Sequence, residues 1–351
     1  MPCLISSHSC CWPVDSSRWN RNRTGKESQR PSDSDSLPGV TEFDLIAAIR
    51  PLLTSQPHVI VGVGDDCAVL ESGPDSDLLL KTDAVVEGIH FLPGTDPERV
   101  GHKALARPLS DIAAMGGTPT AALVTLGLPR GFDPDRVLAL YRGMNRLAAR
   151  HQLAVVGGET TTNPGQWLVS VTVVGFVPRG QALLRSGARV GDALFVSGEL
   201  GGSIEGHHLD FEPRLAQGRW LRSCGWVHSL MDISDGLAGD LPHMLAASGG
   251  HGAELLASAI PIRRAARVQA LDAQAKPPLL AALTDGEDFE LLWTCAPKDA
   301  VRLLDGWKSS FPDVGIHCIG RVMEQPGVRI RDSRGIQQLP PRAYEHFSSH
   351  V

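Results

Sequence analysis

The sequence has no long apolar run and few cysteines, and both shortages narrow the class of protein. No uninterrupted apolar stretch approaches the ~18 residues that a transmembrane helix needs. The first residues lack the continuous apolar segment of a secretory signal. The 7 cysteines include no Cys-x-x-Cys pair, and an odd number of them argues against a disulfide framework. We therefore expect a cytoplasmic protein without a membrane partner.

Concentrated positive charge and the usual phosphate-binding loops are also missing. The chain has 33 Lys and Arg against 39 Asp and Glu, a formal net charge of −6 with no basic block, so nucleic acid is not an expected partner. There is no G-x-x-x-x-G-K-[ST], no H-R-D and no D-F-G, and "GVGDDC" lacks the third glycine of G-x-G-x-x-G. The His and Cys spacings of zinc sites are absent too. A nucleotide-dependent enzyme with this sequence would hold phosphate mainly through metal ions.

What remains is the composition of a globular protein with an unusual start. The 351 residues are 42% hydrophobic and long enough for about two domains. Residues 1–40 are rich in Ser, Arg, Asp and Pro and lack apolar periodicity, which predicts a disordered tail. A start site assigned too early would explain this tail equally well. The tail contains His8, Cys10 and Cys11, which could bind a metal ion, but we interpret them as incidental residues of a disordered segment.

The periodicity of the remaining chain predicts an α+β fold with mixed sheets. We expect a helix over 41–53 that Pro51 interrupts, a helix over 96–117 that Pro108 breaks or kinks, and a helix capped by Asp133. Strands and helices alternate less regularly than in a doubly wound sheet, which favours the α+β class. The segment "PRGQALLRSGARVGDALFVSGELGGS" begins a second unit, so we divide the chain near Pro178 into αβ domains over 41–177 and 178–351. The expected strands are 58–64, 77–83, 121–129, 153–158, 167–177, 193–198, 229–234, 288–294 and 315–322, and the later helices are 236–248 and 298–307.

Six clusters of acidic residues follow or open apolar segments. They are "VGVGDDCAVL", "LKTDAVVEGIHF", "LSDIAAMGG", "VVGGETTT", "MDISDGLAGDL" and "LTDGEDFELL". Turn and capping chemistry would explain any one of them, but their common placement predicts that several converge on one cleft. Converging carboxylates repel unless cations neutralise them, and oxygen ligands suit Mg²⁺. Carboxylates with several Mg²⁺ ions indicate phosphoryl transfer.

The order of the motifs resembles the thiamine-monophosphate kinase family. "GDDCAVL", "KTDAVVEGIHF", "HKALARPLSDIAAMGGTP", "GGETT", "LLRSGARVGD", "MDISDGLAGDL" and "DGEDFEL" carry the resemblance, which covers about residues 41–350. The family shares a superfamily with aminoimidazole ribonucleotide synthetase, selenophosphate synthetase and the hydrogenase maturation ATP enzyme. The resemblance implies a homodimer formed through the N-terminal sheets and an ATP and Mg²⁺ cleft between elements of both domains. It also implies the reaction of ATP with thiamine monophosphate to give ADP and thiamine diphosphate.

The resemblance assigns roles to individual residues. It implies metal ligands at Asp66, Thr82, Asp83, Asp111, Glu159, Asp232 and Asp235, ATP contacts at Gly158, Glu159, Arg185 and Ser234, and substrate contacts at His90, Glu287 and Tyr344. Asp65 is expected to be a structural neighbour of Asp66. No residue is expected to act as a catalytic base, because the attacking phosphate oxygen is already anionic near neutral pH.

Several of these residues also have purely structural readings. His90 would serve as a half-buried packed histidine, Arg185 as a surface ion-pair partner, Glu287 as a turn cap and Tyr344 as a core aromatic. Tyr141 has the helical spacing of a core residue, which we favour over a stacking partner for adenine.

Two departures from the family pattern keep other functions open. Glu159 replaces the usual Asp, so its carboxylate reaches one methylene further. Lys81 replaces a small hydroxyl residue, and its charge would compete with one Mg²⁺ ion. The alternatives are another ATP-dependent enzyme of the same superfamily, or a catalytically inactive sensor of nucleotide or thiamine phosphate. The cysteines of the tail lack the glycine-rich loop that selenophosphate synthesis would need.

Overall fold

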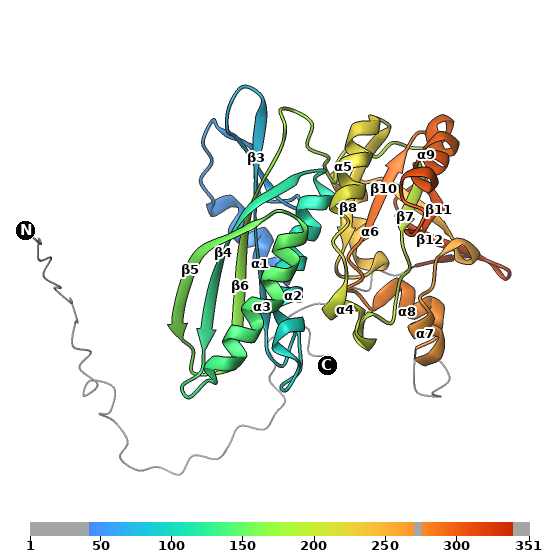
Figure 1. Ribbon diagram of the computed structural model, residues 1–351. Helices are drawn as coiled ribbons and strands as arrows, with labels where there is room; N and C mark the ends of the chain where they lie inside the picture. The colour runs from blue at the N-terminus through green and yellow to red at the C-terminus, as the bar shows by residue number, and fades with distance from the viewer. Residues whose placement is uncertain (1–41, 270–275, 340–351) are drawn as a thin grey trace, which may run out of the picture.

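Two domains, each built on a mixed β-sheet, make up the part of the chain that the structure describes. The computed structural model describes residues 42–269 and 276–339, so the predicted tail over 1–40 and Tyr344 lie outside it (Figure 1). The first sheet and its helices precede Pro178, and the second sheet begins at Ala193. The predicted α+β architecture with two mixed-sheet domains is confirmed.

The N-terminal domain has six strands in the order β1-β2-β3-β6-β4-β5. Only β4 and β5 are parallel within it. The strand bounds are β1 Val59–Val61, β2 Ala68–Glu71, β3 Ser76–Val86, β4 Thr118–Leu128, β5 Ala154–Thr162 and β6 Leu168–Pro178, and the helices are α1 Glu42–Ile49, η2 Arg50–Leu52, α2 Pro97–Ala114 and α3 Pro134–Arg150. The short strand β2 was not predicted, and β5 runs four residues beyond its predicted end at Gly158.

Helix α2 is the element that both domains share. Asp96 caps its start by accepting a hydrogen bond from the backbone N–H of Glu98 at 2.9 Å. We predicted that Pro108 breaks or kinks this helix; the break is wrong, because the helix continues to Ala114. Burial of nearly every residue from Val100 to Ala114 outweighs the one backbone hydrogen bond that proline removes. The predicted cap of α3 is confirmed, since the Asp133 carboxylate accepts from the N–H of Asp135 at 2.9 Å.

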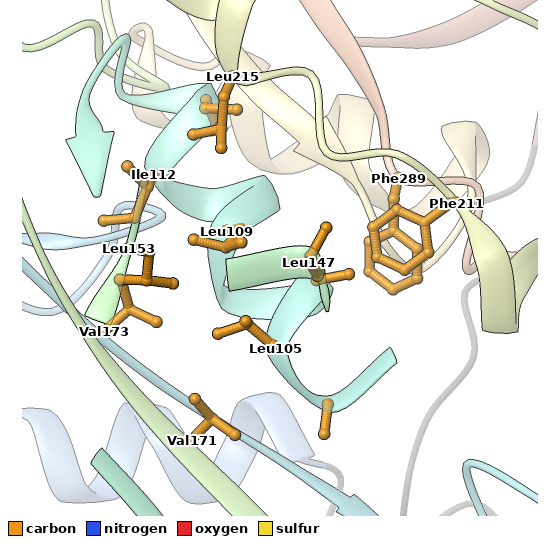
Figure 2. Packing of buried hydrophobic residues seen from close by; sticks show 14 of the residues in the cluster. Leu105, Leu109, Ile112, Leu147, Leu153, Val171, Val173, Phe211, Leu215 and Phe289 are labelled. Carbon is orange, nitrogen blue, oxygen red and sulfur yellow. The ribbon is translucent and has the colours of Figure 1, made fainter. Parts of the chain in front are cut away.

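The apolar core runs from the first sheet through α2 into the second domain. Figure 2 shows Leu105, Leu109 and Ile112 of α2 beside Val171 and Val173 of β6. The other side of α2 contacts α4 His207–Asp210, α5 Leu215–Cys224 and β8 Val227–Ile233. The last turn of α2 is therefore held at the boundary between the domains.

The C-terminal domain has seven strands in the order β13-β12-β9-β11-β7-β10-β8. Its strands are β7 Ala193–Ser197, β8 Val227–Ile233, β9 Gly252–Leu256, β10 Glu290–Cys295, β11 Ile316–Met323, β12 Gly327–Asp332 and β13 Gly335–Gln338, and its other helices are η3 Ser203–Glu205, α6 Leu237–Ala247, η4 Ala257–Ala259, α7 Arg264–Gln269, α8 Pro278–Thr284 and α9 Pro297–Ser310. The sequence predicted β7, β8, β10, β11, α6 and α9 but missed β9, β12, β13 and the helices α4, α5, α7 and α8. Within the described residues, no helix has both the length and the apolar character needed to cross a bilayer.

Candidate active site

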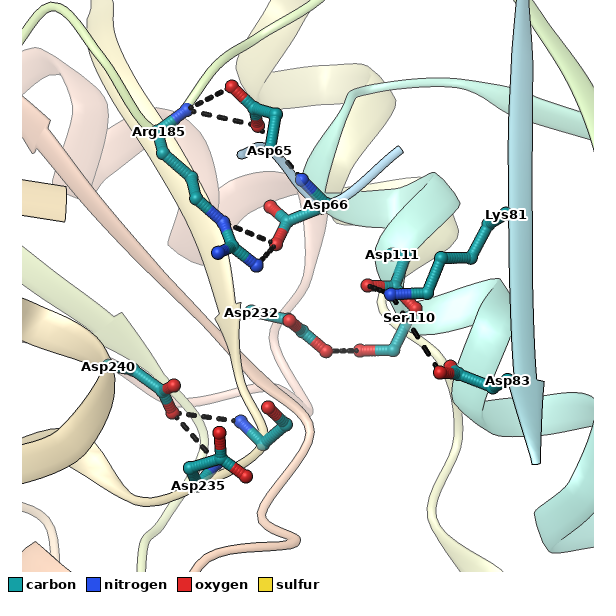
Figure 3. Close-up of polar contacts among 11 residues, drawn as sticks. Asp65, Asp66, Lys81, Asp83, Ser110, Asp111, Arg185, Asp232, Asp235 and Asp240 are labelled. Carbon is teal, nitrogen blue, oxygen red and sulfur yellow. Dashed lines mark hydrogen bonds and ion pairs between the residues drawn. The ribbon is translucent and has the colours of Figure 1, made fainter. Parts of the chain in front are cut away.

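Three buried carboxylates from three separate elements meet at the domain boundary (Figure 3). Asp66 lies between β1 and β2, Asp111 lies near the end of α2, and Asp232 lies near the end of β8. One oxygen from each lies within 4.8 Å of the others, and the residues are only 1%, 5% and 4% exposed. The fold thus brings together carboxylates that lie up to 166 residues apart in the sequence, as the acidic clusters predicted.

The adjacent acids Asp65 and Asp66 lie in a turn between β1 and β2. Because β1 ends at Val61 and β2 begins at Ala68, strand alternation does not separate the side chains of Asp65 and Asp66. Asp65 accepts hydrogen bonds from the backbone N–H groups of Asp66 at 3.0 Å and of Arg185 at 3.2 Å. Its carboxylate therefore fastens this turn to the segment that carries Arg185.

Asp66 has one oxygen paired and one oxygen free for a cation. The guanidinium of Arg185 donates from Nε to Asp66 Oδ1 at 2.8 Å and contacts the same oxygen through Nη2. Asp66 Oδ2 is buried and has no hydrogen-bond partner among the described residues. A buried charged oxygen without a partner costs free energy. The donor set therefore fits a hard divalent cation, which would satisfy this atom.

The side chains of the motif "KTD", residues 81–83 of β3, lie on both faces of the first sheet. Lys81 and Asp83 face α2, where Lys81 Nζ lies 2.8 Å from Asp111 Oδ1 and 3.8 Å from Asp83 Oδ1. Thr82 points to the opposite face and accepts a hydrogen bond from Thr172 Oγ1 at 3.1 Å. Only the lysine and the aspartate thus join the acidic site through their side chains.

Burial disfavours the charged forms of the clustered carboxylates. Burial is the largest cause that raises the pKa of Asp232, to about 6, and the neighbouring Asp66 adds to it. Ser110 opposes this shift by donating a hydrogen bond to Asp232 Oδ2 at 2.6 Å. Burial also raises the pKa of Asp66 and of Asp111, against the opposing charges of Arg185 and Lys81 respectively. The site therefore needs further positive charge to hold all its carboxylates ionised.

Asp240, which sequence reasoning did not single out, fixes the "DISDG" loop. It is 3% exposed, in the first turn of α6, and accepts from the backbone N–H groups of Ser234 at 3.0 Å and Asp235 at 2.9 Å. The available signal was its place in the same motif, "DISDGLAGDL", at the start of a helix. Asp240 thereby orients the loop that follows Asp232.

A cavity of about 600 Å³ begins beside this loop. Its lining includes Ser234, Asp235, His90, Glu287, Arg107 and Phe289. Two of the three residues predicted to contact substrate, His90 and Glu287, therefore lie in one cavity with the "DISDG" loop. The ring of Phe289 stacks on that of Phe211 with centroids 4.0 Å apart, which gives the cavity a packed apolar wall.

Glu287 is held in place by a buried lysine that the sequence analysis also missed. Lys103 is 0% exposed and lies 2.8 Å from the Glu287 carboxylate. Burial opposes ionisation of Glu287, but the hydrogen bond with His208 and the charges of Lys103 and Arg107 lower its pKa to about 2. Burial lowers the pKa of Lys103 to about 8 against the pull of Glu287. The only sequence signal was a lysine within the apolar stretch "HKALARPL".

The structure does not bring every predicted site residue to this place. Gly158 and Glu159 lie on the edge strand β5, exposed and outside the carboxylate cluster. A Cβ on Gly158 would lie 1.7 Å from the Val124 carbonyl oxygen, so strand packing alone requires glycine there. Tyr141 is partly buried against the core, which agrees with its structural reading.

Added Mg²⁺ should raise the melting temperature more at pH 7.5 than at pH 5. Metal ligands must be deprotonated, and Asp232 ionises near pH 6 in the folded chain. Without metal, this raised pKa makes the Asp232 contribution to stability fall as pH rises from 3.8 to about 6, because the unfolded chain ionises first. Differential scanning fluorimetry with and without EDTA measures both effects. A Mg²⁺ effect that is equal at the two pH values would contradict this account.

Comparison with known proteins agrees with the motif order. Residues 64–177 match the family described as "AIR synthase related protein, N-terminal domain". The thiamine-monophosphate kinase of Rhodopirellula baltica is 37% identical over 320 residues, 88% of this chain and 98% of that protein. The enzyme of the same name from Bacillus subtilis is 37% identical over 331 residues, 87% of this chain and 99% of that protein.

Solved structures show the same fold over nearly the whole chain. A structure described as "AaThiL complexed with AMPPCP and TMP" is similar with a TM-score of 0.74 and 31% identity, over 92% of this chain and 100% of that one. The hydrogenase maturation protein HypE of Escherichia coli shares the fold, with a TM-score of 0.65 and 24% identity over 78% of this chain and 87% of that one. This chain is more than 30% identical to the kinases over almost their full length, whereas it is 24% identical to the hydrogenase maturation protein. The chain therefore belongs to the thiamine-monophosphate kinase family.

Proposed function

We propose that this chain transfers the γ-phosphoryl group of ATP to thiamine monophosphate, producing ADP and thiamine diphosphate. The observation that carries the proposal is the "DISDG" loop, which touches both halves of the site. Asp232 belongs to the buried carboxylate cluster, while Ser234 and Asp235, two and three residues later, line the 600 Å³ cavity. A metal site and a substrate-sized cavity are thus adjacent, as phosphoryl transfer requires.

The relative solved with AMPPCP and TMP supports the choice of substrates. The phosphate of thiamine monophosphate is already anionic near neutral pH, so its attack needs no general base. The rate then depends on positioning and electrostatic stabilisation. We accordingly assign no residue as a catalytic base and expect no phospho-enzyme.

Mg²⁺ would be held by Asp66, Asp111 and Asp232, with Asp83 and Asp235 as the neighbouring acids. Bound Mg²⁺ would neutralise charge on the phosphate oxygens. Within the carboxylate cluster, Asp66 Oδ2 is a buried oxygen without a hydrogen-bond partner among the described residues, and a bound cation would satisfy it. For Thr82 and Glu159, which lie outside the cluster, the proposed metal role rests on the family resemblance alone.

Arg185 and Ser234 are the proposed ATP contacts beside the metal. The guanidinium of Arg185 is fixed by Asp66 and retains further N–H groups, and its planar fork suits phosphate oxygens. Ser234 presents its side chain at the wall of the cavity. The ATP contact proposed for Gly158 has no such local support and rests on the resemblance.

The substrate ring is proposed to lie against Glu287, His90 and Phe289. Because the pKa of Glu287 is about 2, its carboxylate is ionised at neutral pH and accepts hydrogen bonds from an aminopyrimidine. Phe289 adds apolar surface to the same cavity. Tyr344 is retained as a substrate contact on the resemblance alone, since it lies outside the described residues.

An assay with purified protein, ATP, Mg²⁺ and either thiamine or thiamine monophosphate tests the reaction. We expect thiamine diphosphate from thiamine monophosphate only, together with an equal amount of ADP. Tight binding of both ligands without ADP would support the sensor instead, and product made directly from thiamine would overturn the phosphate acceptor.

Substituting the two adjacent acids should separate the metal ligand from the structural residue. Asp66→Asn keeps the size but removes an anionic ligand, so we expect a fall in turnover of at least ~10²-fold, partly restored by excess Mg²⁺. Asp65→Asn is the matched control: the Asp65 carboxylate accepts hydrogen bonds from backbone N–H groups, and its substitution should lower stability modestly without changing the Mg²⁺ dependence. Full activity of Asp66→Asn would refute its assignment.

We also propose a cytoplasmic homodimer that forms through the outer face of the first sheet. Leu80, Leu123 and Val156 are 37%, 48% and 62% exposed there, on β3, β4 and β5. This face is the one opposite α2 and α3, and an uncovered aliphatic patch on a sheet is typical of an interface. No nucleic-acid or membrane partner is included in the proposal.

Light scattering at micromolar concentration should therefore show a dimer. Leu123→Lys places a charge in the patch and should shift the protein toward monomer, whereas Leu138→Lys, at a 57% exposed position on α3, should not. A wild-type chain that remains monomeric under these conditions would exclude the dimer.

A further inference from the structure

The side chain of Lys81 ends inside the acidic site. From β3 it reaches across to the last turn of α2, where its Nζ lies 2.8 Å from Asp111 Oδ1 and 3.8 Å from Asp83 Oδ1 (Figure 3). Asp111 is also one of the three clustered carboxylates. The ammonium group therefore contacts one of the carboxylates that would hold a metal ion at the cluster.

Two fixed cations flank the cluster on opposite sides. Arg185 pairs with Asp66, and Lys81 pairs with Asp111, while Asp232 has the neutral hydroxyl of Ser110 as its hydrogen-bond donor. When Asp66, Asp83, Asp111 and Asp232 are all ionised, the four carboxylates and two cations leave a charge of −2. A neutral side chain at position 81 would leave −3 on the same groups.

We propose that Lys81 is a built-in cation that occupies one cation position of this site, between Asp111 and Asp83. The site consequently takes one divalent ion fewer per chain than it would with a small neutral side chain at position 81. The proposal rests on the metal site of the proposed function and concerns how many ions that site accepts.

Geometry and tethering favour the lysine over a free ion at this position. An Asp111 oxygen 2.8 Å from Nζ already has its charge partner, and a Mg²⁺ ion on the same oxygen would place two cations in contact. The ammonium is part of the chain and needs no binding from solution, so a free ion must compete against a high local concentration. The opposing reading is that Lys81 only holds the place of an ion and swings out when that ion binds.

Counting bound metal distinguishes the two readings without any turnover. The full-length chain is titrated with Mn²⁺ alone by isothermal calorimetry and by equilibrium dialysis, as wild type, Lys81→Thr and Lys298→Thr. We expect Lys81→Thr to bind one more Mn²⁺ per chain than wild type. Lys298→Thr, an exposed lysine on α9, should match wild type. Equal numbers for wild type and Lys81→Thr would overturn the proposal.

A second measurement uses the wild-type protein, so it does not depend on folding of the variant. Lysine acetylation by acetic anhydride is followed by mass spectrometry with and without saturating Mg²⁺, with Lys298 as the internal reference. We expect the modification of Lys81 to stay unchanged when Mg²⁺ is added. A tenfold or larger increase would show that the metal expels the ammonium and would overturn the proposal.

The two proposals fail in different ways. A wild-type chain that binds no Mn²⁺ would remove the metal site and the role of Lys81 with it. A chain that binds Mn²⁺ as expected but makes no thiamine diphosphate would overturn the kinase reaction and leave the result for Lys81 standing.

Discussion

The repulsion among buried carboxylates at the domain boundary is the constraint on which this structure depends. Asp66, Asp111 and Asp232 come from different elements and have little contact with solvent. Such a group is tolerated only when its charges are compensated. The compensation comes from both domains, because Arg185 reaches Asp66 across the boundary and Ser110 of α2 donates to Asp232 of β8. The same contacts that relieve the repulsion also join the two sheets.

Helix α2 carries this arrangement because it packs against both domains. One side of the helix lies on the first sheet and the other on α4, α5 and β8, so Ser110 and Asp111 are placed between the two domains. The helix also supplies Lys103, whose buried ammonium lies 2.8 Å from the carboxylate of Glu287, a residue that lines the cavity. A single helix thus positions the metal ligands and the substrate pocket together.

The sequence predicted the class of fold and the convergence of acids because both depend on local chemistry. Apolar periodicity identifies long strands and helices, and carboxylates at their ends identify a cleft. The family resemblance grouped Thr82 with Asp83 as metal ligands, although neighbours on a strand point to opposite faces and the structure places these two side chains so. The packing of α2 that overrides Pro108 and the pairing of buried Lys103 with Glu287 depend on long-range contacts, which no local pattern shows. Asp240 is different, because it bonds to backbone N–H groups five and six residues before it, within its own motif.

Anomalous diffraction from crystals grown with Mn²⁺ and a non-hydrolysable ATP analogue tests the central claim most directly. The claim is that the carboxylates from two domains form a metal site completed by the protein's own cations. The account predicts an anomalous peak within about 2.5 Å of oxygens from Asp66, Asp111 and Asp232, with Lys81 Nζ still in contact with Asp111. Metal bound elsewhere, with the Asp66 Oδ2 oxygen paired to a protein group instead, would contradict it.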